Sequence, residues 1–349
     1  MKAITVEPKN PGSARFEEVP EPEMRDGSVL VEAIAVGVCG TDAEIADGKY
    51  GWAPQGQERL ILGHESLGRV LDPGPGGSFE QGDLVVGIVR RPDPVPCPNC
   101  AVGEWDMCRN GRYTERGIKE IHGFMSERWR IEPDYAIKVD ASLGLLGVLL
   151  EPTTVITKAL EQVVAVGSRS FWEPKTMLVT GAGPIGLLAA LGGAMHGKEV
   201  HVLDRVESGP KPELVRALGA TYHSGRVEDL GFAPDVILEC TGVGSVIADC
   251  VKRIGAGGII CLTGVGAGGV VGGISVADTA AKLVLGNNVL VGSVNANKRH
   301  WYRASQLLAK ADRSWLGKLI TRREAPDDFR KALDRKPDDI KVVVQFSNV

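Results

Sequence analysis

The sequence predicts an α/β protein with two domains, in which a β-rich domain is followed by a doubly wound parallel sheet. The chain has 349 residues, which is more than one typical hydrophobic core accommodates. Residues 1–152 contain short apolar runs broken by Gly, Pro and Asp, a pattern typical of β-rich domains. Residues 153–295 contain apolar strands that alternate with helical patterns, which indicates βαβ units and a parallel sheet.

Individual runs support this division. In the first domain, "VLVEAIAVGVCG" (29–40) and "GDLVVGIV" (82–89) have the composition of strands. In the second, "MLVTGAGPIGLLAALGGAMHG" (177–197) indicates a strand, a glycine turn and a helix, and "EVHVLD" (199–204) indicates the next buried strand. The tail is helical and then ends in "IKVVVQF", so we expect residues 296–349 to complete the first domain.

Composition and charge argue against several classes of protein. The net charge is −4 without a basic block, which argues against a nucleic-acid partner. The N-terminal "MKAITVEPKN" has no apolar signal segment, and no uninterrupted apolar run reaches membrane-spanning length, so we expect no membrane association. The seven cysteines are odd in number and clustered, which favours thiols or metal ligands in a reducing compartment, and we expect the cytoplasm.

A glycine-rich turn, "GAGPIG", follows the apolar strand of the second domain and opens a helix. In this context G-x-G-x-x-G predicts a dinucleotide site, because the glycines allow a tight turn and close approach of a pyrophosphate to the helix N-terminus. An acid at the end of the next strand, Asp204, would bind the ribose 2′-hydroxyl and favour NAD, while the adjacent Arg205 leaves NADP possible. The residues expected at the cofactor are Gly181, Gly183, Pro184, Ile185, Gly186, Asp204, Arg205 and Thr241.

Three residues of the first domain are candidate metal ligands. Cys39 lies in "GVCGTD", and His64 lies in "GHESLG", where no second His follows four residues later, which excludes a zincin helix. Glu151 ends the apolar run "LGVLLE", where an unpaired buried charge would be costly. Alternatives remain for each residue: a small buried cysteine, a histidine satisfied within the core, and a glutamate in a helix cap or salt bridge.

The ordered segments "VGVCGTD", "LGHESLG", "QGDLVV", "EP" and "GAGPIG", with a cysteine lobe between the third and fourth, resemble zinc-dependent medium-chain alcohol and polyol dehydrogenases. The resemblance covers essentially the whole chain. Within that superfamily, "CGTDAEI", "GDLVVGIVRRP", "GRYTERGIKEIHGFMSERW" and "GSVNANKRHW" are similar to the glucose 1-dehydrogenase branch. The resemblance implies a GroES-like catalytic domain, a Rossmann nucleotide-binding domain and a homodimer or homotetramer.

The resemblance also implies roles for individual residues. Cys39, His64 and Glu151 are expected to surround a catalytic zinc, with Glu65 either as an alternating ligand or as a residue that contacts the ligands. Thr41 is the expected hydroxyl in the proton path. Classical alcohol dehydrogenases carry a proton-passing histidine five residues after the zinc cysteine, where this chain has Glu44 instead.

Sugar recognition is expected at two further positions, and the resemblance also implies that Asn295 in "SVNAN" lies near the nicotinamide end of the cofactor. The resemblance implies that Glu115 in "YTERG" and His300 in "NKRHW" contact the sugar, in addition to Thr41 and Glu151. Val89 stands where some relatives carry a sugar-binding asparagine. The expected reaction is oxidation of an aldose, D-glucose first, at C1 to the lactone with hydride transfer to NAD(P). The alternatives are a polyol or threonine dehydrogenase, or a zinc-free nucleotide-binding sensor or structural protein.

The cysteine lobe, "CPNCAVGEWDMC", matches the last three cysteines of a four-cysteine structural zinc lobe in the relatives. A closed zinc site needs four ligands, and Pro94 stands where the first cysteine is expected. We expect Asp93 to supply the fourth ligand, with Asp106 as the second choice and an empty lobe as the alternative. The predicted structural zinc ligands are Asp93, Cys97, Cys100 and Cys108.

Overall fold

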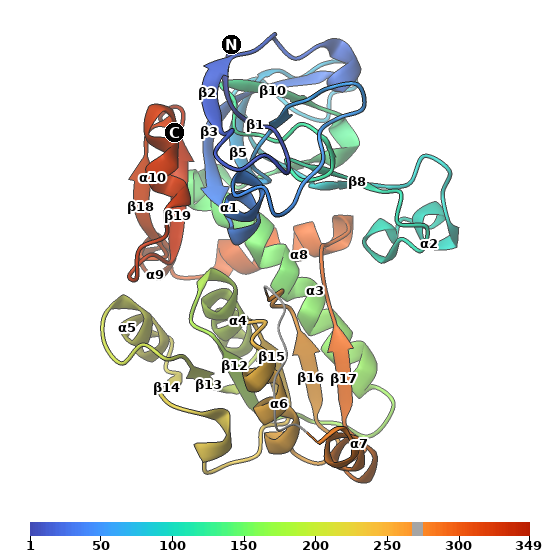
Figure 1. Ribbon diagram of the computed structural model, residues 1–349, viewed down its shortest axis with the longest axis vertical. Coiled ribbons are helices and arrows are strands. Elements are labelled where there is room, and N and C mark those ends of the chain that lie inside the picture. The colour runs from blue at the N-terminus through green and yellow to red at the C-terminus, as the bar shows by residue number, and fades with distance from the viewer. Residues whose placement is uncertain (267–274) are drawn as a thin grey trace. The chain divides into compact units, whose positions relative to one another are not determined.

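The computed structural model describes residues 1–266 and 275–349, which divide into two compact units. The first unit consists of Met1–Glu151 and Ala296–Val349, and the second of Pro152–Asn295. The boundaries predicted from the sequence lie within one residue of these. The predicted fold class, a β-rich domain with a separate parallel-sheet domain, is confirmed (Figure 1).

The first unit is built around the long strand β3 (Val29–Val38), which is apolar at nearly every position and mostly buried. β3 pairs antiparallel with β5 (Glu65–Asp72), with β10 (Arg128–Ile131) and with the C-terminal strand β19 (Lys341–Gln345). Figure 1 shows this return of the red tail to the blue β3. The sheet is extended by β6 (Leu84–Gly87), β11 (Ala136–Lys138) and β18 (Ile320–Glu324).

Two small sheets and several short helices complete the first unit. The strands of these two sheets are β1 (Lys2–Val6), β2 (Arg15–Glu18) and β4 (Leu60–Ile61), and then β7 (Arg90–Arg91), β8 (Thr114–Arg116) and β9 (Glu120–Ile121). The helices are α1 (Gly40–Ala46), α2 (Pro98–Ala101), α8 (Lys298–Lys310), α9 (Arg313–Gly317) and α10 (Phe329–Leu333). α1 begins directly after β3, so residues at the end of this strand are held against the first turn of a helix.

The second unit has a fully parallel sheet whose spatial order is β14-β13-β12-β15-β16-β17. The strands are β12 (Thr176–Thr180), β13 (Glu199–Leu203), β14 (Thr221–His223), β15 (Val236–Glu239), β16 (Ile259–Leu262) and β17 (Val289–Gly292). The connecting helices are α4 (Pro184–Met195), α5 (Pro210–Ala217), α6 (Gly244–Arg253) and α7 (Val276–Leu285). The strand order reverses between β12 and β15, and ligands of such sheets bind at the carboxyl ends of the strands at this reversal.

One described helical stretch, residues 141–167, is long and apolar enough to span a membrane, and 67% of its most apolar window is buried inside the protein. It consists of a 3-10 segment followed by α3 (Leu150–Gly167). Burial of this extent is typical of the core helix of a globular protein.

Candidate active site

Cys39, His64 and Glu65 lie together in the first unit, with one ligand atom from each within 4.8 Å of the others. Cys39 follows β3 as the N-cap of α1, and Glu65 is the first residue of β5. The antiparallel register pairs Gly37 with Glu65, which brings the end of β3 beside the start of β5. A methyl group on Gly37 would lie 2.0 Å from Glu65 Oε2, so only glycine accommodates the glutamate there.

Asp42 orients His64 in this group. The Asp42 side chain is fully buried, and its Oδ1 lies 3.4 Å from His64 Nδ1. Its other oxygen accepts a hydrogen bond from the Cys39 backbone N–H at 2.8 Å. Burial lowers the pKa of His64, but Asp42 raises it and prevails. A carboxylate behind a histidine is the usual second partner of a metal ligand, and the sequence interpretation did not assign Asp42 to the site.

Lys341, from β19, forms a buried ion pair with Glu65. Its Nζ lies 2.7 Å and 2.6 Å from the two carboxylate oxygens, and both side chains are 2% exposed. Burial lowers the pKa of Lys341, and the Glu65 carboxylate reverses this and raises it. The sequence interpretation missed this lysine. Its one signal is a charged residue at the start of the apolar run "KVVVQF".

The donor atoms of Cys39, His64 and Glu65 are suited to bind a zinc ion. Thiolate, imidazole and carboxylate are the donors that Zn²⁺ prefers. Glu151, the second residue of α3, lies outside the group of three but within its electrostatic range. Its pKa is raised to about 7, first by burial and then by the Glu65 carboxylate, against the opposing effect of His64. Thr41 Oγ1 lies 4.0 Å from the Cys39 sulfur.

The three cysteines of the lobe also lie together, with their sulfur atoms within 4.8 Å of one another. Backbone N–H groups, that of Arg109 first, lower the pKa of Cys97 to about 6, whereas burial raises that of Cys100 to about 11. A thiol whose pKa is lowered near neutral pH is already suited to bind a metal as the thiolate.

The Asp93 carboxylate lies outside this group of three sulfur atoms, and its role as the fourth ligand stays a prediction. Its two carboxylate oxygens accept hydrogen bonds from the Val95 N–H at 2.9 Å and from the Asn110 amide at 2.8 Å. The carboxylate therefore closes the turn at the start of the lobe. The second choice, Asp106, is buried and accepts a hydrogen bond from the Asn297 amide at 3.0 Å.

The residues expected at the sugar have partners within the first unit. The buried Glu115 accepts hydrogen bonds from Nε and Nη2 of Arg90, at 3.1 Å and 3.0 Å, and the Arg90 guanidinium covers the ring of Tyr113. His300 is fully buried, and its Nδ1 accepts a hydrogen bond from the Asn297 N–H at 3.1 Å as part of the cap of α8. The structure thus gives His300 a helix-capping role that the sequence interpretation did not predict.

The glycine turn of the second unit has the geometry that its sequence predicts. Gly181 follows β12 with φ +90°, and Gly183 is the N-cap of α4. A methyl group on Gly186 would lie 1.8 Å from the Gly181 carbonyl oxygen, so helix and turn pack without side chains between them. The carboxylate of Asp204 accepts hydrogen bonds from the Ala182 N–H at 2.6 Å and from the Val206 N–H at 3.2 Å.

Other residues expected at the cofactor lie at the carboxyl ends of the same sheet. Thr241 follows β15, and its methyl carbon would lie 3.0 Å from a methyl group on Gly181. Asn295, beyond β17, has a left-handed backbone conformation with φ +61°. Arg205 is exposed beside Asp204. The second unit therefore places the predicted pyrophosphate turn, acid and following turns at one edge of the sheet, as dinucleotide binding requires.

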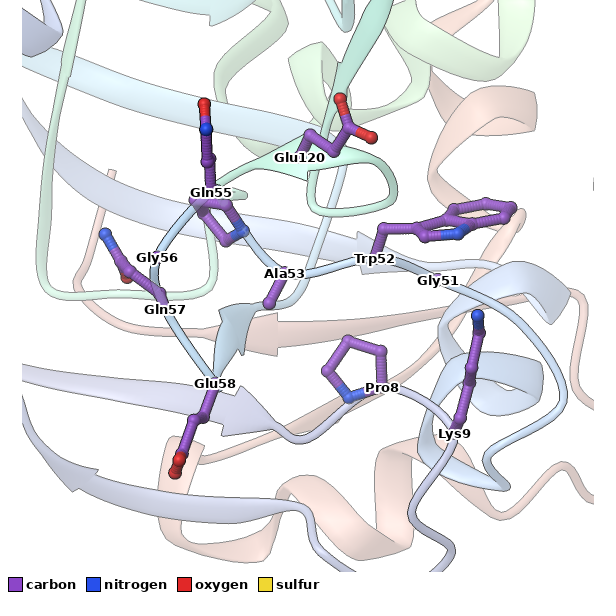
Figure 2. Close-up of a pocket in the computed structure, with 11 residues that line it drawn as sticks. Pro8, Lys9, Gly51, Trp52, Ala53, Gln55, Gly56, Gln57, Glu58 and Glu120 are labelled. Atoms are coloured by element: carbon purple, nitrogen blue, oxygen red, sulfur yellow. The ribbon is translucent and has the colours of Figure 1, made fainter.

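A pocket elsewhere in the first unit is drawn in Figure 2. Its volume is about 620 Å³. It is lined by Pro8, Lys9, residues 51–58 and Glu120, and it contains none of the predicted site residues. Its side chains are of mixed charge and polarity, and the Gln57 side-chain oxygen is already bonded to His122 Nε2 at 2.7 Å. We assign no role to this cavity.

Comparisons with known proteins agree with the fold of both units. Residues 25–141 match the family model "Alcohol dehydrogenase GroES-like domain", and residues 144–346 match the family model "Glucose dehydrogenase C-terminus". Fold and site thus define a zinc-dependent medium-chain dehydrogenase. Within this class, the chain belongs to the glucose dehydrogenase family.

Relatives and solved structures cover the whole chain. The chain is 40% identical to the glucose 1-dehydrogenase of Thermoproteus tenax and 38% identical to glucose 1-dehydrogenase 1 of Caldivirga maquilingensis, over 99% of each chain. It is 33% identical to the glucose dehydrogenase of Haloferax mediterranei solved in complex with NADP, Zn and gluconolactone. That likeness has a TM-score of 0.93 and covers 100% of both chains.

Proposed function

We propose that this protein oxidises D-glucose at C1 to gluconolactone and transfers the hydride to NAD(P). The observation that carries the proposal is the convergence of Cys39, His64 and Glu65 into one group of zinc-type donors. The similarity to a glucose dehydrogenase that binds NADP, Zn and gluconolactone supports the sugar as substrate. In the reaction the C1 O–H and C–H bonds break, a C1=O bond forms, and the hydroxyl proton leaves to solvent.

The residues of the first unit have separable tasks in this reaction. When bound, zinc polarises the substrate hydroxyl and lowers its pKa, and the nicotinamide supplies the hydride acceptor. Cys39 and His64 would hold the metal, and Asp42 keeps the imidazole in position. Thr41 is placed beside Cys39 to accept the hydroxyl proton and pass it on, and the exposed Glu44 on the same helix offers a route to solvent.

A screen of aldoses and polyols with NAD and NADP tests the proposal. We expect D-glucose to give the highest kcat/KM when reduction of the cofactor is followed by absorbance. Metal analysis of the same preparation should find zinc. A preference for sorbitol, another polyol or threonine would replace glucose with the rival substrate. A preparation without zinc and without turnover would leave a nucleotide-binding sensor or structural protein instead.

We infer further that NAD is preferred to NADP. Asp204 directly follows β13 at the edge of the sheet where the dinucleotide would bind, and its carboxylate would repel a 2′-phosphate. Asp204→Ser is expected to shift the kcat/KM ratio of NADP to NAD upward by about tenfold, or about 1.4 kcal/mol. Arg205→Ala is the matched control and should move the ratio the other way. A wild-type preference for NADP would show that Arg205 or Lys211 outweighs Asp204.

We propose that the chain forms a homodimer through the edge of the parallel sheet. β17 is the last strand of that sheet, and Leu290 in it is 41% exposed. On the preceding helix α7, Val284 and Leu285 are 73% and 84% exposed. Apolar surface at a sheet edge favours association. Sedimentation equilibrium is expected to give a dimer mass for the wild type and a monomer mass for Leu290→Lys, whereas a tetramer would require a second interface.

We also propose that the protein is located in the cytoplasm. All seven cysteines lie in the described chain and none of them forms a disulfide. Free thiols of this number suit a reducing compartment. Fractionation of the native cells, followed by immunodetection, measures the location.

A further inference from the structure

Glu239 is a buried carboxylate at the dinucleotide edge of the second unit. It is the last residue of β15 and is 0% exposed. The strand register pairs it with Thr180 of β12, the residue before the glycine turn. An ionised carboxylate removed from water is costly unless its oxygens are hydrogen-bonded. Its partners therefore show what this residue does.

The carboxylate is satisfied by the turn that follows it. Oε1 accepts hydrogen bonds from the Thr241 N–H at 2.8 Å and from the Thr241 hydroxyl, and Oε2 accepts one from the Gly242 N–H at 3.0 Å. The Thr180 hydroxyl donates to Oε1 at 3.3 Å. Within the described chain, no Lys, Arg or His nitrogen lies within ion-pair distance of Glu239. The hydrogen-bond donors to its carboxylate are therefore the backbone and hydroxyl groups of Thr180, Thr241 and Gly242.

The turn held by Glu239 is packed between two other turns at the same edge. A methyl group on Gly181 would lie 3.0 Å from Thr241 Cγ2, which places the turn against the glycine turn. A methyl group on Gly264 would lie 2.3 Å from the Gly242 nitrogen, which places it against the segment after β16. The Glu239 carbonyl also accepts hydrogen bonds from the N–H groups of Thr263 and Gly264, at 2.8 Å and 3.1 Å.

We propose that Glu239 is a positioning residue for the dinucleotide. Its carboxylate fixes residues 240–242 so that they form the wall of the cofactor site beside the glycine turn. Gly242 adopts a left-handed conformation with φ +67°, which glycine accommodates without strain, and in it the backbone N–H donates to the Glu239 carboxylate. The inference rests on the proposed NAD(P)-dependent function and extends it to a residue that need not touch the substrate.

Glu239→Gln tests the proposal because it keeps the shape of the side chain but removes the charge and replaces one acceptor oxygen with a donor. We expect the Kd of the dinucleotide, measured by fluorescence titration without sugar, to rise about tenfold. The KM for the dinucleotide should rise in parallel, while zinc content, the KM for glucose and kcat at saturating cofactor stay close to wild type. Glu213→Gln, on the exposed face of α5, is the matched control and should leave the Kd unchanged.

An unchanged Kd in Glu239→Gln would overturn the inference. A lower melting temperature with an unchanged Kd of the folded protein would show that Glu239 has a structural role only. If Glu239→Gln does not fold, Glu239→Asp replaces it, with an expected rise in Kd of a few-fold because the shorter carboxylate does not reach both N–H groups. If the wild type oxidises glucose and these variants bind the dinucleotide normally, only the role of Glu239 is refuted and the proposed function stands. A wild type that binds neither NAD nor NADP refutes the proposed function as well.

Discussion

His64→Ala is expected to lower kcat/KM for D-glucose by about a thousandfold or more. The imidazole is one of three donors that converge on the zinc site, and it is buried with Asp42 behind it. Loss of a metal that stabilises developing charge removes several kcal/mol of transition-state stabilisation and raises the barrier by that amount. Each 1.36 kcal/mol is a tenfold change in rate. Steady-state kinetics together with zinc analysis of the same sample measures the effect.

Two variants sharpen this test. Asp42→Asn keeps the shape behind His64 but weakens its orientation, so a loss of about 10- to 100-fold in activity or zinc affinity is expected. His196→Ala removes an exposed histidine at the end of α4 and should retain full activity. Glucose oxidation that persists in His64→Ala after its zinc is gone would contradict the assignment of the site.

Lys341→Met is expected to destabilise the zinc-free protein by about 3–5 kcal/mol, because it leaves the Glu65 carboxylate buried without its cation. Both side chains are 2% exposed, so water does not replace the lost partner. Zinc bound beside Glu65 would supply an alternative positive charge, and the loss should therefore be smaller in the zinc-loaded protein. Urea unfolding, with and without chelator, measures both values.

Matched variants separate the ion pair from general disturbance of the strand. In Lys341→Met/Glu65→Gln the uncompensated charge is absent, and part of the lost stability should return. Lys331→Met breaks an exposed pair with Asp328 and should cost at most about 0.5 kcal/mol. A Lys341→Met protein as stable as wild type in chelator would show that the Glu65 carboxylate is hydrated or protonated when the lysine is absent.

Features encoded by neighbouring residues could be predicted from the sequence. The glycine turn, the helix after it and Asp204 lie within one βαβ unit, and glycines in that spacing permit one compact backbone geometry. The cysteines of the lobe are likewise separated by a few residues and converge as predicted. The Asp93 carboxylate, the predicted fourth ligand, accepts hydrogen bonds from Val95 and Asn110 in the turn at the start of the lobe, and the sequence did not indicate these partners.

The partners of the buried charges were decided only by the tertiary structure. Glu65 and Lys341 are 276 residues apart in the chain, and they meet because β19 returns to pair with β3 beside β5. In the sequence Glu239 is an ordinary acid at the end of a strand, and only the structure shows that the turn after β15 encloses it. Local spacing determines backbone geometry, whereas the partner of a buried charge depends on which strands pair, and that pairing is settled by the packing of the whole unit.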